Sequence, residues 1–180
     1  MATPSDNSMG SKEEELCSSP LPFNNANNAD GSDMDILRDL TIVDKLNNSK
    51  FTIFLAESNS TKQTYALKLF PFKNDKISDY YRTEIKFKQL KHQNVIQVYD
   101  TNREMDMILN GKKFVASYVL MEYAPHKDFF NLLMKRKIKL DEKLVRTFFH
   151  QLIAGIEYMH GVGAYHLDLK LDNLLLGKEY

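Results

Sequence analysis

The stretch from residue 165 to 176, YHLDLKLDNLLL, constrains the fold of this chain more than any other part of it. Asp168, Lys170 and Asn173 alternate there with apolar residues, so a short segment presents a carboxylate, an ammonium and an amide together. These groups are the set needed to hold a hydroxyl, a phosphate and a metal ion around one point. The fold therefore has to fix this segment on an apolar core and present it at a cleft.

The composition is that of a soluble globular protein of one domain, with 43% hydrophobic and 27% charged residues in a chain of 180. The formal net charge is zero, so no overall field favours nucleic acid or an anionic membrane as a partner. Residues 1–35 nevertheless carry seven acids and one base, a net of −6, which leaves +6 on the remainder. We interpret this as a solvated acidic tail beside a mildly basic domain, with an inhibitory tail lying over that domain as the alternative.

Cys17 is the only cysteine, so no disulfide can form within the chain, which suits a reducing compartment. No apolar run approaches the roughly 18 residues that a membrane-spanning helix needs. The N-terminus lacks the layout of a signal peptide, and Ala2 stands where myristoylation requires glycine. We therefore expect an intracellular, cytoplasmic protein without membrane contact, and the nucleus is the alternative location.

The chain divides into a polar tail and two structured regions. Residues 1–36 are rich in Ser, Asn and Asp and bury too little apolar surface to offset their ordering entropy, so we expect an acidic disordered tail. Residues 37–122 predict an α+β fold, a five-strand antiparallel sheet with one helix near 78–91 between strands three and four. Asn110-Gly111 is a two-residue hairpin signal between the last two strands. The strands are expected at 40–43, 51–56, 64–70, 95–109 and 114–122.

The pattern becomes helical in residues 123–180. A short helix is expected at 128–134, and a long one begins at Asp141, a good N-cap, and is stopped by Gly161. Apolar residues recur along the long helix at steps of three and four and cover a wide face. Because a surface helix needs only one apolar stripe, we expect partners on several sides of residues 141–160.

The segment around Asp168 closely resembles the catalytic loop of Ser/Thr protein kinases, and the resemblance extends over residues 38–180. It implies a kinase small lobe at 37–122 and a partial, mainly helical large lobe at 123–180, closest to the calcium/calmodulin-dependent type. Such an enzyme uses ATP and Mg²⁺ to transfer the γ-phosphate to a Ser or Thr of a protein substrate. The resemblance assigns Asp168 to the substrate hydroxyl, Lys170 to the transferred phosphate and Asn173 to Mg²⁺.

Ala66-Leu67-Lys68 resembles the strand motif whose lysine holds the α- and β-phosphates, with a helix glutamate as its partner. Counting back from the turn at residues 92–94 places Thr83 in the position of that glutamate. Only a carboxylate can pair with a lysine, so the expected partner is Glu84.

The resemblance also implies a nucleotide site between the two lobes. Met121 corresponds to the gatekeeper, the backbone of Glu122 and Ala124 to the adenine-binding hinge, and Asp128 to the acid that bonds the ribose. The adenine is expected to lie between three apolar residues: Phe54, Ala66 and Leu175.

Two segments depart from the family pattern. The loop that covers the phosphates holds Asn47, Ser49 and Thr52 at its glycine positions. Glycine lets this backbone approach the phosphates, and a β-branched residue tolerates the required angles poorly, so we expect weak nucleotide binding. Leu167 replaces the arginine that pairs with a phosphorylated activation loop, so control by such phosphorylation is not expected.

The Asp-Phe-Gly metal ligand of the family would fall past Tyr180. Asn173 alone is a poor Mg²⁺ ligand set, because hard cations bind several oxygens. We therefore expect residues 1–180 alone to transfer no phosphate. One alternative is a non-catalytic interaction module that offers a face of the 141–160 helix to a partner. Another is a small-molecule phosphotransferase, a class that shares the Asp and Asn spacing but lacks the lysine at the position of Lys170.

Overall fold

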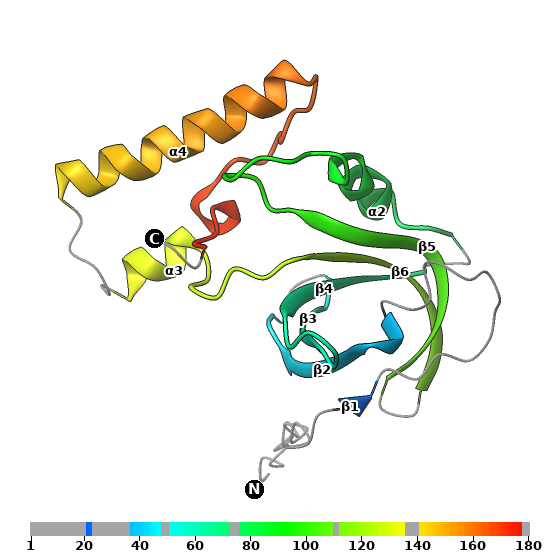
Figure 1. Cartoon of the computed structure of the whole chain (residues 1–180). Helices are drawn as coiled ribbons and strands as arrows, with labels where there is room; N and C mark the ends of the chain where they lie inside the picture. Colours follow the sequence, from blue (N-terminus) through cyan, green and yellow to red (C-terminus); the bar gives the residue numbers. More distant parts are fainter. Residues whose placement is uncertain are drawn as a thin grey trace, which may run out of the picture.

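The computed structural model describes residues 21–22, 37–47, 51–72, 76–109, 112–135 and 141–177, and it has the α+β architecture expected from the sequence (Figure 1). One antiparallel sheet has the strand order β1-β2-β3-β4-β6-β5. Its strands are β1 (Leu21–Pro22), β2 (Leu40–Lys45), β3 (Ile53–Ser58), β4 (Thr64–Pro71), β5 (Val98–Leu109) and β6 (Lys112–Glu122).

Each face of the sheet has its own apolar cluster. Side chains alternate between faces along a strand, so Leu67 and Leu69 of β4 lie on one side, where they join a large buried cluster. Phe70 lies on the other side and packs there with Tyr81 of α2 (Asp79–Glu84). Lys68 shares this second face, so the strand presents its lysine to the helix.

The five expected strands are all present, with ends that differ by up to three residues. The fourth begins at Val98 rather than at 95, because Val95 instead forms an isolated bridge with His92. β5 and β6 pair antiparallel, as a hairpin requires. The hairpin residues Asn110 and Gly111 lie outside the described residues.

The strand β1 was not expected from the sequence. Leu21 pairs with Ile42 and Pro22 with Thr41, so β1 lies at the edge of the sheet beside β2. Proline suits an edge strand because it has no N–H to offer a further neighbour. The remaining residues of the segment 1–36 lie outside the described part of the chain.

The helix expected at 78–91 is shorter in the structure. Ser78 caps α2 through its hydroxyl, and after Glu84 the chain tightens into the 3-10 helix η1 (Ile85–Phe87). The N–H groups of Lys88 and Leu90 donate to carbonyls three residues back. Such bonds satisfy the last carbonyls of a helix, so the α-helical pattern ends there.

Two helices follow the sheet. α3 (Phe129–Met134) begins at the N-cap Asp128, and α4 (Glu142–Gly161) begins at Asp141, as expected. The Asp141 carboxylate accepts the N–H of Leu144 at 2.8 Å, which is the bond of an N-cap. No helix in the described residues is long and apolar enough to cross a membrane.

α4 ends at Gly161, as expected, but the left-handed residue that closes its end is Gly163. Gly163 has a φ of +74°, and its N–H donates to the carbonyl of His160 at 3.0 Å. The N–H of Ala164 donates to the carbonyl of Met159 at 2.8 Å. This pair of bonds is a Schellman motif, which needs a left-handed residue where Gly163 stands.

α4 packs against the turn that follows η1. The hydroxyl of Tyr158 accepts the N–H of Lys91 at 2.9 Å, and its ring stacks on His92 with centroids 5.0 Å apart. A Cβ on Gly155 would stand 3.0 Å from the carbonyl oxygen of Asn94, so glycine permits this close approach. The helical part of the chain therefore meets the sheet part at a second point, besides the covalent connection after β6.

Candidate functional site

Lys68 and Glu84 form a close ion pair between β4 and α2. The Nζ of Lys68 donates to the Oε2 of Glu84 at 2.6 Å, and the two side chains are only 19% and 26% exposed. Thr83, the alternative partner, uses its hydroxyl to donate to the carbonyl of Asp79. A charge-assisted bond of this kind fixes the position of the lysine head.

Aromatic rings surround the head of Lys68, and the sequence did not predict this. The Nζ of Lys68 lies 5.2 Å from the centre of the Phe70 ring and 5.8 Å from that of Phe51. The Phe51 ring also lies 5.1 Å from that of Tyr80 on α2. Aromatic faces attract a cation, so these rings add to the fixation of the ammonium.

The loop after α4 brings Asp168, Lys170 and Asn173 together. The Nζ of Lys170 lies 2.9 Å from the Oδ2 of Asp168. The amide nitrogen of Asn173 donates to the same Oδ2 at 3.0 Å and to the Asp168 carbonyl at 2.7 Å. The 3-10 helix η2 (Leu171–Asn173) turns the chain back so that both side chains reach one carboxylate.

The charges on this loop are fixed by its contacts. Hydrogen bonds from Lys170, and then from Asn173, hold the pKa of Asp168 below its ordinary value. The same contact with Asp168 raises the pKa of Lys170. Both side chains are exposed, so the pair adds little to the stability of the fold. Its consequence is chemical, because at neutral pH an ionised carboxylate that can accept a bond from a hydroxyl stands beside a full positive charge.

Backbone hydrogen bonds fix this loop to the start of α3. Asp128 and Leu175 form an isolated antiparallel bridge. Two N–H···O bonds flank it, at 2.8 Å from Phe129 to Leu174 and at 2.9 Å from Leu176 to Lys127. The loop therefore has a fixed place relative to the segment that leaves the sheet.

That segment is the expected hinge. Met121 pairs with Ala66 across β6 and β4, two residues from Lys68. The backbone N–H of Glu122 donates to the carbonyl of Gln97 at 2.8 Å, so this donor is used within the protein. Of the two residues expected to bind adenine through their backbone, Glu122 and Ala124, the one whose N–H group remains for the adenine is therefore Ala124. The hinge thus connects the Lys68 end of the site to the loop that holds Asp168.

Asp128 is a helix cap in the structure. Its carboxylate accepts the backbone N–H of Asn131 at 2.7 Å and the side-chain amide of Asn131 at 2.6 Å. Partial burial alone would raise the pKa of Asp128, but these hydrogen bonds outweigh it and the pKa lies below its ordinary value. Its expected contact with a ribose stays a prediction.

The expected place of Phe54 over the adenine is wrong. In the register of β3 on β4, Leu55 pairs with Ala66 and Ile53 with Lys68, and directly opposed residues share a face. Phe54 lies on the opposite face, buried in the large cluster. A shift of one residue in a strand exchanges its faces. Leu55 is the residue that stands beside Ala66, whereas Leu175 is half exposed on the loop.

The segments that depart from the family pattern have defined contacts. The side-chain oxygen of Asn47 accepts the N–H of Ile53 at 3.0 Å, and the carbonyl of Thr52 accepts the N–H of Leu69 at 2.9 Å. Ser49 lies outside the described residues. Leu167 has a φ of +61° and is 92% exposed, a strained conformation for a leucine and an unusual exposure.

The described residues fit a nucleotide phosphate better than they fit a complete metal site. Lys68 is a cation whose position is fixed by Glu84, and a fixed ammonium is the kind of group that phosphate oxygens bind. The amide nitrogen of Asn173 points at Asp168, which leaves the amide oxygen as the candidate metal ligand. Within the described ranges no group of three or more His, Cys, Asp or Glu side chains is placed to hold a metal ion.

Comparisons with known proteins agree with this geometry. The family described as protein kinase domain matches residues 48–180. A Saccharomyces cerevisiae protein named fatty acyl-CoA synthetase and RNA processing-associated kinase 1 is 34% identical over 134 residues, which cover 67% of this chain and 14% of that one. CBL-interacting protein kinase 11 of Oryza sativa subsp. japonica is 34% identical over 130 residues, covering 69% and 24%.

CBL-interacting serine/threonine-protein kinase 2 of Arabidopsis thaliana is 30% identical over 130 residues, which cover 69% of this chain and 26% of that protein. The matched part of this chain therefore spans only a seventh to a quarter of the length of these curated relatives.

Proposed function

We propose, from the premise that this chain belongs to the protein kinase family, that its site serves phosphoryl transfer from ATP to a Ser or Thr hydroxyl of a protein substrate. The observation that carries the proposal is the 2.6 Å pair of Lys68 and Glu84, two residues 16 positions apart that only the fold brings together. Members of this family use ATP with a divalent metal ion. ATP supplies the phosphoryl group, and the metal ion neutralises its charge.

Lys68 and the hinge would hold the nucleotide. The Lys68 ammonium, fixed by Glu84 and by the ring of Phe70, is suited to the oxygens of the α- and β-phosphates. The backbone of Glu122 and Ala124 is assigned to the adenine edge, with Met121 as gatekeeper. The three apolar residues assigned to the adenine faces are now Leu55, Ala66 and Leu175.

The loop would orient the acceptor. Asp168 is ionised and accepts the hydrogen bond of the substrate hydroxyl, so the oxygen lone pair is directed at phosphorus and the proton has a base to move to. Lys170 stands 2.9 Å from that carboxylate and is placed to neutralise charge on the transferred group. Asn173 contributes an amide oxygen as a metal ligand.

We further propose that residues 1–180 alone transfer no measurable phosphate, because the amide oxygen of Asn173 by itself is a poor ligand set for Mg²⁺. The test is a γ-phosphate transfer assay on purified 1–180 with a generic Ser/Thr substrate. Robust transfer that Asp168→Asn abolishes would show that this part of the proposal is wrong.

Nucleotide binding tests the site separately from transfer. A fluorescent ATP analogue titrated into the chain should bind at least tenfold more weakly to Lys68→Met, because the phosphates lose their fixed cation. Lys62→Met is the matched control, since that lysine is 70% exposed and lies in the turn between β3 and β4. Equal affinity for wild type and both variants would contradict the assignment of Lys68.

A second candidate function is that of an interaction module built on the kinase fold. The observation that favours it is on α4, where Val145, Phe149 and Ile153 are 45%, 60% and 46% exposed. Such a large apolar stripe is a docking surface or an aggregation risk. Binding of an apolar dye that Phe149→Glu removes supports it, and monomeric behaviour without dye binding counts against it.

The cytoplasm is the proposed location, supported by the single cysteine of the chain. The proposed partner is the protein substrate, and the zero net charge gives no reason to add nucleic acid or a membrane. If a fluorescent fusion of the chain accumulates in the nucleus, the assignment to the cytoplasm is wrong.

A further inference from the structure

The ring of Phe51 lies over the ammonium of Lys68. Phe51 belongs to the segment between β2 and β3, and its ring is partly buried against the cluster that contains Phe70. Its ring centre lies 4.9 Å from that of Phe70 on β4 and 5.1 Å from that of Tyr80 on α2. The ring therefore joins the strand that carries Lys68 to the helix that carries Glu84.

The space between this ring and the ammonium is too small for a phosphate. The Nζ of Lys68 lies 5.8 Å from the centre of the Phe51 ring. A phosphate oxygen bound to an ammonium stands about 2.8 Å from the nitrogen, and it stands about 3.5 Å from the ring atoms that it touches. Even one oxygen thus needs about 6 Å between the two groups, and a whole phosphate needs more. A phosphate that binds Lys68 from this side has to displace the ring.

The backbone next to Phe51 is held by hydrogen bonds. The carbonyl of Thr52 accepts the N–H of Leu69 at 2.9 Å. The side-chain oxygen of Asn47 accepts the N–H of Ile53 at 3.0 Å, which joins the two ends of the segment that contains Phe51. A glycine at this position has no side chain with which to make such a bond. The residue that replaces glycine thus adds a contact that helps to keep Phe51 in its place.

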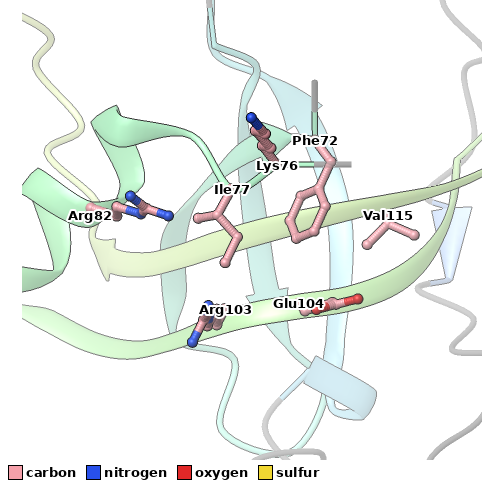
Figure 2. A pocket seen from close by; sticks show the side chains of 7 residues that line it. All are labelled: Phe72, Lys76, Ile77, Arg82, Arg103, Glu104 and Val115. Atoms are coloured by element: carbon pink, nitrogen blue, oxygen red, sulfur yellow. The ribbon is translucent and has the colours of Figure 1, made fainter. Parts of the chain in front are cut away.

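The cavity beside α2 is not a second way to the ammonium. It has a volume of about 320 Å³, and Phe72, Ile77 and Arg82 are among its lining residues (Figure 2). Neither Lys68 nor Phe51 lines it. A ligand of Lys68 therefore does not bind there, and the space that matters is the one over which the Phe51 ring lies.

We propose that the Phe51 ring and a nucleotide phosphate compete for Lys68, so that Phe51 sets the affinity of the site for phosphate-containing ligands. This inference rests on the proposed function, because it takes a nucleotide as the ligand. Binding requires the ring to leave the ammonium and the rings of Phe70 and Tyr80. The apparent affinity is then reduced in proportion to the fraction of molecules in which the ring is already displaced.

Two ligands of one variant test the competition by calorimetry. Phe51→Ala should bind a non-hydrolysable ATP analogue about five- to tenfold more tightly than wild type, because no ring has to be displaced. Its affinity for adenosine, which carries no phosphate, should stay unchanged. Phe149→Ala is the matched control, since it removes a ring that is 60% exposed on α4, and it should change neither affinity. A loss of affinity for both ligands in Phe51→Ala would show that the ring only supports the site, and would overturn the proposal.

The reactivity of Lys68 tests the same claim without a nucleotide. Acetic anhydride modifies lysines, and mass spectrometry gives the rate at Lys68 relative to that at Lys62, whose side chain is 70% exposed. The relative rate should rise several-fold in Phe51→Ala, and inorganic triphosphate should protect Lys68 at a several-fold lower concentration than in wild type. An unchanged rate and unchanged protection would overturn the proposal. Failure to bind adenosine in every chain would count against the proposed function and leave this result standing.

A tryptophan in place of Phe51 covers the case in which Phe51→Ala does not fold. The chain has no tryptophan, so the fluorescence of Phe51→Trp reports on this position alone. Acrylamide should quench the emission weakly in the free protein and more strongly when inorganic triphosphate is bound. Quenching that saturating triphosphate leaves unchanged would mean that the ring stays in place, and the competition would be refuted.

Discussion

Three glycines near one end of α4 should respond in different ways to the same change, glycine to alanine. Within a helix this change usually stabilises by about 1 kcal/mol, because alanine has the higher helix propensity. At Gly155 the new Cβ stands 3.0 Å from the carbonyl oxygen of Asn94 and 3.4 Å from its Cβ. Overpacking of this kind costs about 1–3 kcal/mol. The net effect expected for Gly155→Ala is a destabilisation of about 1 kcal/mol.

The other two glycines are the matched comparisons. Gly161 is the last helical residue and has nothing within 4 Å of an added Cβ, so Gly161→Ala should stabilise by about 0.5–1 kcal/mol. Gly163 also has open space, but its φ is +74°, so Gly163→Ala should destabilise by about 1–2 kcal/mol through backbone strain alone.

Urea unfolding followed by circular dichroism at 222 nm measures all three free energies of unfolding. The order expected is Gly161→Ala above wild type and the other two variants below it. If Gly155→Ala is as stable as Gly161→Ala, then α4 does not approach the turn at residues 91–94. In that case our account of how the helical part is held on the sheet part is wrong.

Three further predictions concern the site. Removing the ammonium in Lys170→Met should raise the pKa of Asp168 toward its ordinary value, and a carboxyl NMR titration that shows no movement would contradict the assigned cause. In wild type the bonds to this carboxylate hold the loop at pH values above the ordinary Asp pKa, and they are lost as the pH falls through the lowered pKa. Phe54→Ala should destabilise the fold by about 3–5 kcal/mol, whereas Leu55→Ala should mainly weaken binding of a fluorescent ATP analogue. If Phe54→Ala instead weakens nucleotide binding and Leu55→Ala unfolds the protein, then Phe54 is the residue at the adenine after all. Leu167→Gly should stabilise the chain by up to about 1 kcal/mol, because glycine adopts a φ of +61° without strain. Urea unfolding measures the free energy of unfolding, and a lower value for the variant would contradict this account of Leu167.

The features that the sequence predicted well involve residues that are close together in the sequence, or an interaction that only one type of side chain can make. Asp168, Lys170 and Asn173 lie within six residues, so a single turn of 3-10 helix is enough to bring them together. The pair of Lys68 and Glu84 is distant in sequence, but only a carboxylate can satisfy a half-buried lysine, and that argument chose Glu84 over Thr83. Periodicity located the five strands and α4, because burial on one side imposes it.

The features that sequence missed depend on register or on contacts between distant segments. Phe54 was placed on the wrong face of the sheet because successive residues of a strand face opposite sides, so an error of one residue in the alignment exchanges the faces. The residue types of the strand do not determine which alignment is correct. The end of α4 at Gly161 was expected, but the left-handed residue that closes it is Gly163, and only backbone geometry selects that glycine. The stacking of Tyr158 on His92 joins residues 66 positions apart, and neither residue type indicates such a partner.

The bridge between Asp128 and Leu175 has a mechanical consequence. Hydrogen bonds on both sides of it attach residues 127–129 to residues 174–176, so the beginning of α3 and the loop that carries Asp168 have to rotate as a unit. Upstream, the N–H of Glu122 is bound to Gln97 and belongs to the sheet. The covalent link between these two anchored points is residues 123–126, and α4 also packs on residues 91–94 of the sheet part, so opening of the two halves has to change both the torsion angles of that link and this packing.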